Sequence, residues 1–83
     1  MLKSVLFVCT GNTCRSVMAE YLLRHRAQEK GIELKVASAG LHAFAGDTAA
    51  ENALGALAEL GIENVKHRSR RVQPHLLAEY DLI

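Results

Sequence analysis

The feature that most constrains the fold is a short apolar segment joined to a long helical pattern by a glycine-containing turn. Residues 5–8 form a continuous run of strand-forming side chains, and residues 10–13 have the composition of a turn. From Arg15 to Lys30 apolar residues recur at spacings of four, until Gly31 stops the pattern. The succession predicts a strand buried on both faces, a tight loop and an amphipathic helix. The helix positions expected to face inward are Met18, Ala19, Leu22, Leu23 and Ala27.

The same succession repeats in the middle of the chain. Residues 34–40 predict a second strand, closed by its last three residues, and a loop follows. Asp47 or Thr48 is expected to cap a second helix that runs to about Leu60, with Gly61 just past its end. The positions of this helix expected to face inward are Ala50, Ala53, Leu54, Leu57 and Leu60.

The last part of the chain predicts one more helix and one more strand. Residues 67–72 form a polar connector, and a short helix begins near Gln73, with Pro74 tolerated in its first turn. Residues 81–83 have the composition of a third strand that is just opening.

Strands that alternate with helices at these spacings predict an α/β fold. The expected architecture is three-layered, α/β/α, with a parallel sheet and right-handed crossovers. A parallel sheet needs both faces covered and more strands than two. We therefore expect residues 1–83 to be the N-terminal portion of a single domain whose C-terminal part is missing. The other reading is a small domain completed by a partner or by dimerisation, and the oligomeric state is open.

Charge and composition exclude several classes of protein. The formal net charge is +1, and no aromatic residues interleave with the basic clusters at residues 24–26 and 67–71, so we expect no nucleic-acid partner. No apolar stretch approaches the length of a membrane span, and the N-terminus lacks the pattern of a signal peptide. We expect a cytoplasmic protein without membrane attachment. Cys9 and Cys14 fit neither a disulfide framework nor a zinc site, so no metal is expected.

The strongest functional signal is the string Cys-Thr-Gly-Asn-Thr-Cys-Arg-Ser at residues 9–16, here called the Cys9 loop. It lies between a buried strand and a helix N-terminus, where successive backbone N–H groups can point into one hollow and the helix adds its own partial positive charge. The result is an anion site of the size of phosphate. Gly11 and Asn12 tolerate backbone conformations that other residues avoid. The residues expected to bind phosphate are Thr10, Gly11, Asn12, Thr13, Cys14 and Arg15.

The side chains of the Cys9 loop indicate nucleophilic chemistry. A thiol at Cys9 that faces several N–H donors and an arginine has a lowered pKa and is present as the thiolate. The planar guanidinium of Arg15 can bind two oxygens of a phosphoryl group at once. Attack of sulfur on phosphorus would give a phosphocysteine intermediate that water hydrolyses, and Ser16 is placed to donate its hydroxyl to the sulfur. This chemistry requires no cofactor and no metal.

The Cys9 loop, followed by Met18, Ala19 and Glu20, resembles the signature of the low-molecular-weight protein tyrosine phosphatase family. The resemblance is greatest to its bacterial protein-arginine phosphatase branch, and it continues through residues 38–40, 61–62 and 67–69. It implies the phosphotyrosine protein phosphatase I-like fold and a phosphorylated protein substrate.

The resemblance also assigns roles to single residues. It implies that Cys9 is the nucleophile, that Arg15 binds phosphate and that Ser16 assists the thiolate. It further implies a hydrogen-bonded brace that holds the loop, made by Asn12, Ser38 and His67. Thr13 occupies the position where, in this family, threonine goes with phosphoarginine and an isoleucine-like residue with phosphotyrosine.

Two departures from the family pattern stand out. The family has proline after the Arg-Ser pair, where this chain has Val17, and we expect only a small cost. The general-acid aspartate of the family lies well beyond residue 83, and neither Asp47 nor Asp81 matches its position. We expect little or no turnover and doubtful folding if these residues are the whole protein.

Three alternatives stay open from the sequence. A thioredoxin-linked arsenate reductase of the same fold shares a Cys-x5-Arg loop with Gly-Asn. A non-catalytic phosphate-binding module would retain the loop without turnover. Cys14 either packs in the core or forms a disulfide with Cys9 under oxidation.

Overall fold

The computed structural model describes residues 2–83, and its strands form one small parallel sheet. The elements in chain order are β1 (Ser4–Cys9), α1 (Arg15–Glu29), β2 (Lys35–Gly40), α2 (Glu51–Glu59) and α3 (Pro74–Ala78). β1 and β2 run parallel from the pair Ser4–Lys35 to the pair Cys9–Gly40. On the opposite edge of β1, Val5 forms a parallel bridge with Leu82, where the third strand is predicted. The α/β class and the parallel sheet predicted from the sequence are confirmed.

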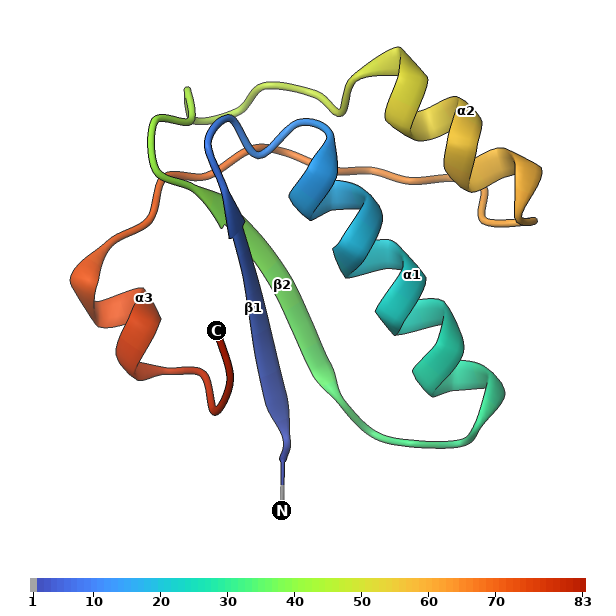
Figure 1. The fold of residues 1–83 in the computed structure, drawn as a ribbon, viewed down its shortest axis with the longest axis horizontal. Coiled ribbons are helices and arrows are strands. Elements are labelled where there is room, and N and C mark those ends of the chain that lie inside the picture. Colours follow the sequence, from blue (N-terminus) through green and yellow to red (C-terminus); the bar gives the residue numbers. More distant parts are fainter. Residues whose placement is uncertain (1) are drawn as a thin grey trace.

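The helices cover the two faces of this sheet. Figure 1 shows α1 and α2 on one side of the strands and α3 on the other. α1 packs against both strands, and α2 packs against α1. On the other face a buried cluster joins the strands to α3, and its members are Leu6, Ala39, Leu76 and Tyr80. The two faces of one sheet are thus covered by different helices, as the three-layer prediction requires.

Helix α1 begins and ends where the sequence predicts, but its buried face differs from the prediction. Gly31 follows its end with φ of 66°, and the N–H of Ile32 donates to the carbonyl of Ala27. Leu22, predicted to face inward, is 38% exposed, whereas the polar Glu20 is buried at 4%. The apolar spacing was misleading because the face of α1 toward β2 carries a polar contact between Glu20 and Ser38.

The prediction for α2 is wrong at its start and for the side chain of Leu60, whereas its predicted end near Leu60 is confirmed. Neither Asp47 nor Thr48 caps the helix, which begins after Ala50 without a side-chain cap. Thr48 instead forms an antiparallel bridge with Arg68. Leu60 lies past the last helical residue and is 60% exposed, so it does not face inward.

Two local predictions about glycine and proline are confirmed. Gly61 follows α2 with φ of 82°, a conformation that suits glycine. Pro74 is the first residue of α3, and Gln73 precedes it in an extended conformation. Within residues 2–83, no helix combines the length and the apolar character needed to cross a membrane.

Candidate active site

The Cys9 loop connects the carboxyl end of β1 to the first turn of α1, and its carbonyl groups point outward. The carbonyl of Cys9 accepts from the N–H of Leu41 at 2.8 Å, and that of Thr10 accepts from His42 at 2.9 Å. The carbonyl of Thr13 accepts from the N–H of Ala50 at 2.8 Å. Neighbouring segments thus satisfy these carbonyls, while the N–H groups of Gly11, Asn12 and Ser16 are directed toward the Cys9 thiol.

The thiol of Cys9 lies inside this loop. Its Sγ is 3.0 Å from Ser16 Oγ and accepts the N–H of Asn12 at 3.3 Å. Burial raises the pKa of the Cys9 thiol, but the Ser16 hydroxyl and backbone N–H groups of the loop lower it by more, so the pKa lies below its ordinary value of 9.0. The thiolate is therefore favoured relative to an ordinary cysteine.

The hydrogen bonds of Asn12 leave the proton of Ser16 available to Cys9. The Oδ1 of Asn12 accepts the backbone N–H of Arg70 at 3.0 Å, so its Nδ2 must be the donor to Ser16 Oγ at 2.9 Å and to Ser38 Oγ at 2.8 Å. Ser16 Oγ accepts from Asn12, and its own proton is free to point at Cys9 Sγ. A thiolate has no proton to give, so with Cys9 ionised Ser16 is the donor, and this hydrogen bond favours the thiolate.

The backbone of Asn12 is held as firmly as its side chain. Asn12 has φ of 56° in the left-handed region and is fully buried. Its carbonyl accepts from Ser69 Oγ at 2.7 Å and from His67 Nε2 at 2.8 Å. A carbonyl oxygen only accepts, so His67 carries its proton on Nε2. The structure therefore brings Asn12, Ser38 and His67 together by hydrogen bonds.

Glu20 extends this network into α1. The hydroxyl of Ser38 donates to Glu20 Oε1, and Arg24 Nη2 lies 2.7 Å from Glu20 Oε2. The Nδ1 of His67 is 4.0 Å from Glu20 Oε1, beyond hydrogen-bond distance. A buried carboxylate is tolerated here because a hydroxyl and a guanidinium satisfy its oxygens.

Gly40 fixes where the Cys9 loop can lie relative to β2. A Cβ on Gly40 would lie 2.7 Å from the carbonyl oxygen of Thr10 and 3.0 Å from the backbone N of Asn12. Only glycine allows this close approach. Gly11 behaves differently from the prediction, because it takes no positive φ, and a Cβ there would meet Thr13 Oγ1 at an ordinary 3.8 Å.

The remaining predicted site residues lie along the same loop. Arg15 is the first residue of α1, and its side chain is exposed. Thr13 and Cys14 are half-buried, and Cys9 and Cys14 are both free thiols. Among the described side chains, no group of three or more His, Cys, Asp or Glu could hold a metal ion.

Comparison with known proteins decides the family. Residues 4–83 match the family described as low molecular weight phosphotyrosine protein phosphatase. The chain belongs to this family. It is 40% identical over 79 residues to the protein-arginine-phosphatase of Bacillus subtilis, covering 95% of this chain and 52% of that relative. The chain spans about half the length of the curated relatives it matches.

Solved structures of family members have the same fold over this length. The tyrosine phosphatase Wzb from Escherichia coli K30, crystallised in complex with sulphate, superimposes with a TM-score of 0.86 and 36% identity, covering 99% of this chain and 55% of that one. A mutant of the arginine phosphatase YwlE, with serine in place of cysteine and a phosphorylated active-site serine, gives a TM-score of 0.90 and 39% identity, covering 95% and 51%.

Several residues of the hydrogen-bonded network around Cys9 are not predicted from the sequence. Glu20 was read only as part of a motif, although it lies four residues after Ser16 and hence on the same face of α1. Ser69 lies in a segment that resembles the family, but neither its hydroxyl nor the backbone of Arg70 is assigned a role from the sequence. Their contacts with Asn12 span more than fifty residues of chain, and no local pattern reveals such contacts.

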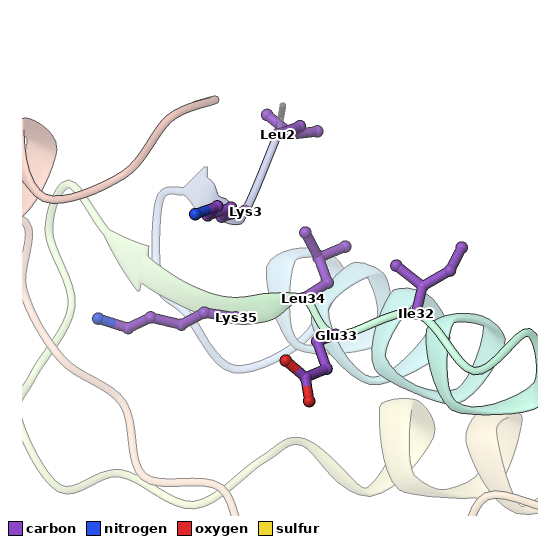
Figure 2. Close-up of a pocket in the computed structure, with 6 residues that line it drawn as sticks. All are labelled: Leu2, Lys3, Ile32, Glu33, Leu34 and Lys35. Atoms are coloured by element: carbon purple, nitrogen blue, oxygen red, sulfur yellow. The ribbon is translucent and has the colours of Figure 1, made fainter.

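Among the cavities found in the described part of the chain, the one with the largest volume lies at the opposite end of the sheet from the Cys9 loop. Its volume is about 1000 Å³, and its lining residues are Leu2, Lys3, Ile32, Glu33, Leu34 and Lys35. Figure 2 shows Ile32 and Leu34 directed to the side on which Leu2 lies, whereas Glu33 points away. The cavity contains no residue of the Cys9 loop and no thiol or hydroxyl nucleophile, so it is not a candidate for the reaction.

Proposed function

We propose that this protein is a phosphatase that hydrolyses phosphorylated protein residues through a phosphocysteine intermediate. The observation that carries the proposal is the position of Cys9 Sγ, which accepts from Asn12 N–H and from the Ser16 hydroxyl inside a loop of inward N–H groups. Membership of the phosphatase family and the sulphate-bound and phosphoserine-bearing relatives support it. The partners proposed are a phosphorylated protein and, as a product, phosphate.

In the first step the phosphoryl group would bind against the loop N–H groups, with two of its oxygens on the Arg15 guanidinium. The thiolate of Cys9 attacks phosphorus in line, an S–P bond forms, and the bond from phosphorus to the leaving oxygen or nitrogen breaks. The leaving group takes the bonding electron pair and requires a proton. The loop residues proposed to bind the phosphoryl group are Thr10, Gly11, Asn12, Thr13, Cys14 and Arg15.

In the second step water attacks the phosphocysteine and the S–P bond breaks. The sulfur leaves as a thiolate, and the proton of Ser16 stabilises its charge at 3.0 Å. Asn12, Ser38 and His67 would support this step indirectly, by holding the loop and the Ser16 hydroxyl in place.

The two aspartates noted in the sequence are not proposed as the general acid. The carboxylate of Asp81 accepts the N–H groups of Lys3 and Ser4, at the start of β1. Cys9 ends that strand, about 17 Å away at ~3.3 Å per residue. Asp47 is exposed and makes its contacts through its backbone. We propose that residues 1–83 are one portion of a single phosphatase domain, whose acid comes from elsewhere in the domain.

Thr13 makes phosphoarginine the first substrate to test. The side chain is half-buried in the Cys9 loop, and the carbonyl of Thr13 is fixed by Ala50. Replacing Thr13 with isoleucine is expected to raise the ratio of phosphotyrosine to phosphoarginine hydrolysis, measured on two peptides that differ only in the phosphorylated residue. An unchanged ratio would remove Thr13 from the specificity argument.

The central test is hydrolysis of p-nitrophenyl phosphate, whose leaving group needs little help from an acid. Circular dichroism first establishes that each variant is folded. Turnover is expected from the wild type and from Cys14→Ser, and no turnover from Cys9→Ser. Arg15→Lys keeps the charge but loses the two-pronged donor, so its KM should rise and its kcat fall.

The alternatives predict different outcomes of this assay. A phosphate-binding module would bind phosphate in a folded wild-type protein but release no nitrophenol. An arsenate reductase of this fold would consume reduced thioredoxin when arsenate is added. Either result would replace the proposed phosphatase function.

A further inference from the structure

A second cleft, apart from the Cys9 loop, follows the edge of β2 that faces away from β1. Its volume is about 490 Å³, and residues of β2, α1 and the connector line it, together with Tyr80. None of residues 9–16 is among its lining residues. We call it the basic cleft, defined by the cations Arg24, Lys35, Lys66, Arg68 and Arg70.

The charge of the basic cleft differs sharply from that of the whole chain. The chain has 10 Lys and Arg against 9 Asp and Glu, a net charge of +1. Half of those basic residues line this one cleft, and Glu20 is the one acidic residue among its lining residues. Glu20 is already paired with Arg24 at 2.7 Å, so the other four cations have no further carboxylate among the residues that line the cleft. A bound anion would supply the missing counter-charge.

Two of these cations, Arg24 and Arg70, are held in place by hydrogen bonds within the protein. Arg24 donates from Nε and Nη2 to the carbonyl of Val36, at 3.2 and 2.9 Å. Arg70 donates from Nε to the carbonyl of Ser38 and from Nη2 to the hydroxyl of Tyr80, both at 3.1 Å. Side chains fixed before binding lose little entropy when a ligand arrives, which favours a site over a merely solvated surface.

The same contacts narrow the class of ligand. The two arginines cover outer carbonyls of β2, so an added peptide strand would have to displace them. Arg24 lies 5.0 Å from the ring centre of Tyr21, and Lys35 lies 4.8 Å from that of Tyr80, so cations already occupy the ring faces on which a base would stack. The cations come from α1, from β2 and from the connector between α2 and α3. A short chain of phosphates carries more charges to pair with such a set than a single phosphate ion does.

We propose that the basic cleft is an accessory anion site that binds a compact oligophosphate, either free inorganic polyphosphate or the phosphate chain of a nucleotide. The cleft recognises the linked phosphates by charge and by fixed guanidinium donors. The proposal does not depend on phosphatase activity, because the site and its binding can be measured whether or not the Cys9 loop turns over substrate.

Binding of tripolyphosphate, followed by ¹H–¹⁵N NMR, tests the proposal. Inorganic phosphate is kept in excess to occupy the Cys9 loop. We expect saturable shifts of the amides of Ser38, Arg68 and Tyr80. The double variant Lys35→Ala, Lys66→Ala should weaken binding by about three- to tenfold, since each exposed ion pair contributes a modest amount. The matched control, Lys3→Ala with Lys30→Ala, removes the same charge outside the cleft and should leave the Kd unchanged.

A comparison of ligands distinguishes the two sources. Equal Kd values for ATP and tripolyphosphate would support the phosphate chain as the recognised group, and tighter binding of ATP would identify a nucleotide. Shifts confined to residues 9–16, shifts that do not saturate, or equal weakening in the two double variants would each overturn the proposal.

Discussion

The two ends of the sheet differ in how deeply their side chains are buried. At the carboxyl end of β1 and β2, the Cys9 loop is held by buried polar groups that hydrogen-bond one another, with Asn12 at the centre. At the other end the side chains of Leu2 and Ile32 are 47% and 54% exposed around an open cavity. Every buried side-chain nitrogen or oxygen atom in the described part of the chain has a hydrogen-bond partner.

The difference shows what a reactive loop requires. Apolar contacts hold a backbone in place without directing it, whereas hydrogen bonds fix the direction of each donor and acceptor. From Glu20 through Ser38, Asn12 and Ser16, each bond is oriented so that the last proton points at Cys9 Sγ. The opposite end needs no such direction, so changes there should affect stability mildly and reactivity hardly at all.

The largest effect is expected from Asn12→Ala. The substitution removes the donor that Ser38 and Ser16 share and leaves the part-buried N–H of Arg70 without its acceptor, and it should lower the free energy of unfolding by about 3–5 kcal/mol. Asn64→Ala is the matched control, because Asn64 also has a positive φ, of 60°, but is exposed. Urea denaturation of both variants separates the hydrogen bonds from the backbone strain. Equal losses would mean that the polar network does not stabilise the loop.

Gly40→Ala should have the next largest effect. Its methyl group would lie 2.7 Å from the carbonyl oxygen of Thr10, so either the Cys9 loop or β2 must move, at a cost of about 1–3 kcal/mol. Gly55→Ala provides the contrast, since nothing lies within 4 Å of its added Cβ in α2, and the protein should gain about 0.5–1 kcal/mol. Thermal unfolding of both measures the difference. If Gly40→Ala were as stable as Gly55→Ala, the close approach between Gly40 and the Cys9 loop would not be required for stability.

Ser16→Ala should change reactivity more than stability. Without the hydroxyl the pKa of Cys9 should rise toward its ordinary value of 9.0, because burial remains while the largest opposing contact is lost. Alkylation rates against pH, measured in a Cys14→Ser background, report this pKa. If the midpoint of the alkylation profile does not move in Ser16→Ala, the backbone N–H groups alone lower the pKa of Cys9.

The lowered pKa of Cys9 also determines how the stability of the folded protein changes with pH. Cys9 releases its proton at lower pH in the folded protein than in the unfolded chain. Its contribution to the free energy of unfolding is therefore complete above pH 9.0 and is lost as the pH falls through the pKa of the folded state. In Ser16→Ala this rise of stability with pH should be smaller.

The features of the fold and the site that can be predicted from the sequence are those set by contacts between residues close together in the chain. Residues 9–16 form one local pattern, so the strand, loop and helix were readable from the sequence. The left-handed conformation expected at Asn12 is also present. The predicted cap of α2 failed because residues 47–50 are used instead to fasten the connector and the loop, through Ser69 and Thr13. Tertiary contacts of this kind override local propensity and leave no periodic signal.

The smallest effect is expected at the opposite end, from Asp81→Asn. The N–H group of Lys3 lowers the pKa of Asp81 by more than desolvation raises it, and the N–H group of Ser4 lowers it further, so the pKa lies below its ordinary value of 3.8. The folded carboxyl therefore loses its proton more readily than the unfolded one. Its contribution to stability is present above 3.8 and disappears as pH falls through the folded pKa. Asparagine keeps an acceptor oxygen but not the charge.

Asp81→Asn should thus be slightly less stable than the wild type at pH 7 and equal to it near pH 2 to 3, by urea denaturation. Asp47→Asn is the control, because Asp47 makes its contacts through its backbone, and its stability should follow the wild type at both pH values. Alkylation of Cys9 should be unchanged in Asp81→Asn. A change in that rate would mean that the two ends of the sheet are coupled, and the contrast between them would fail.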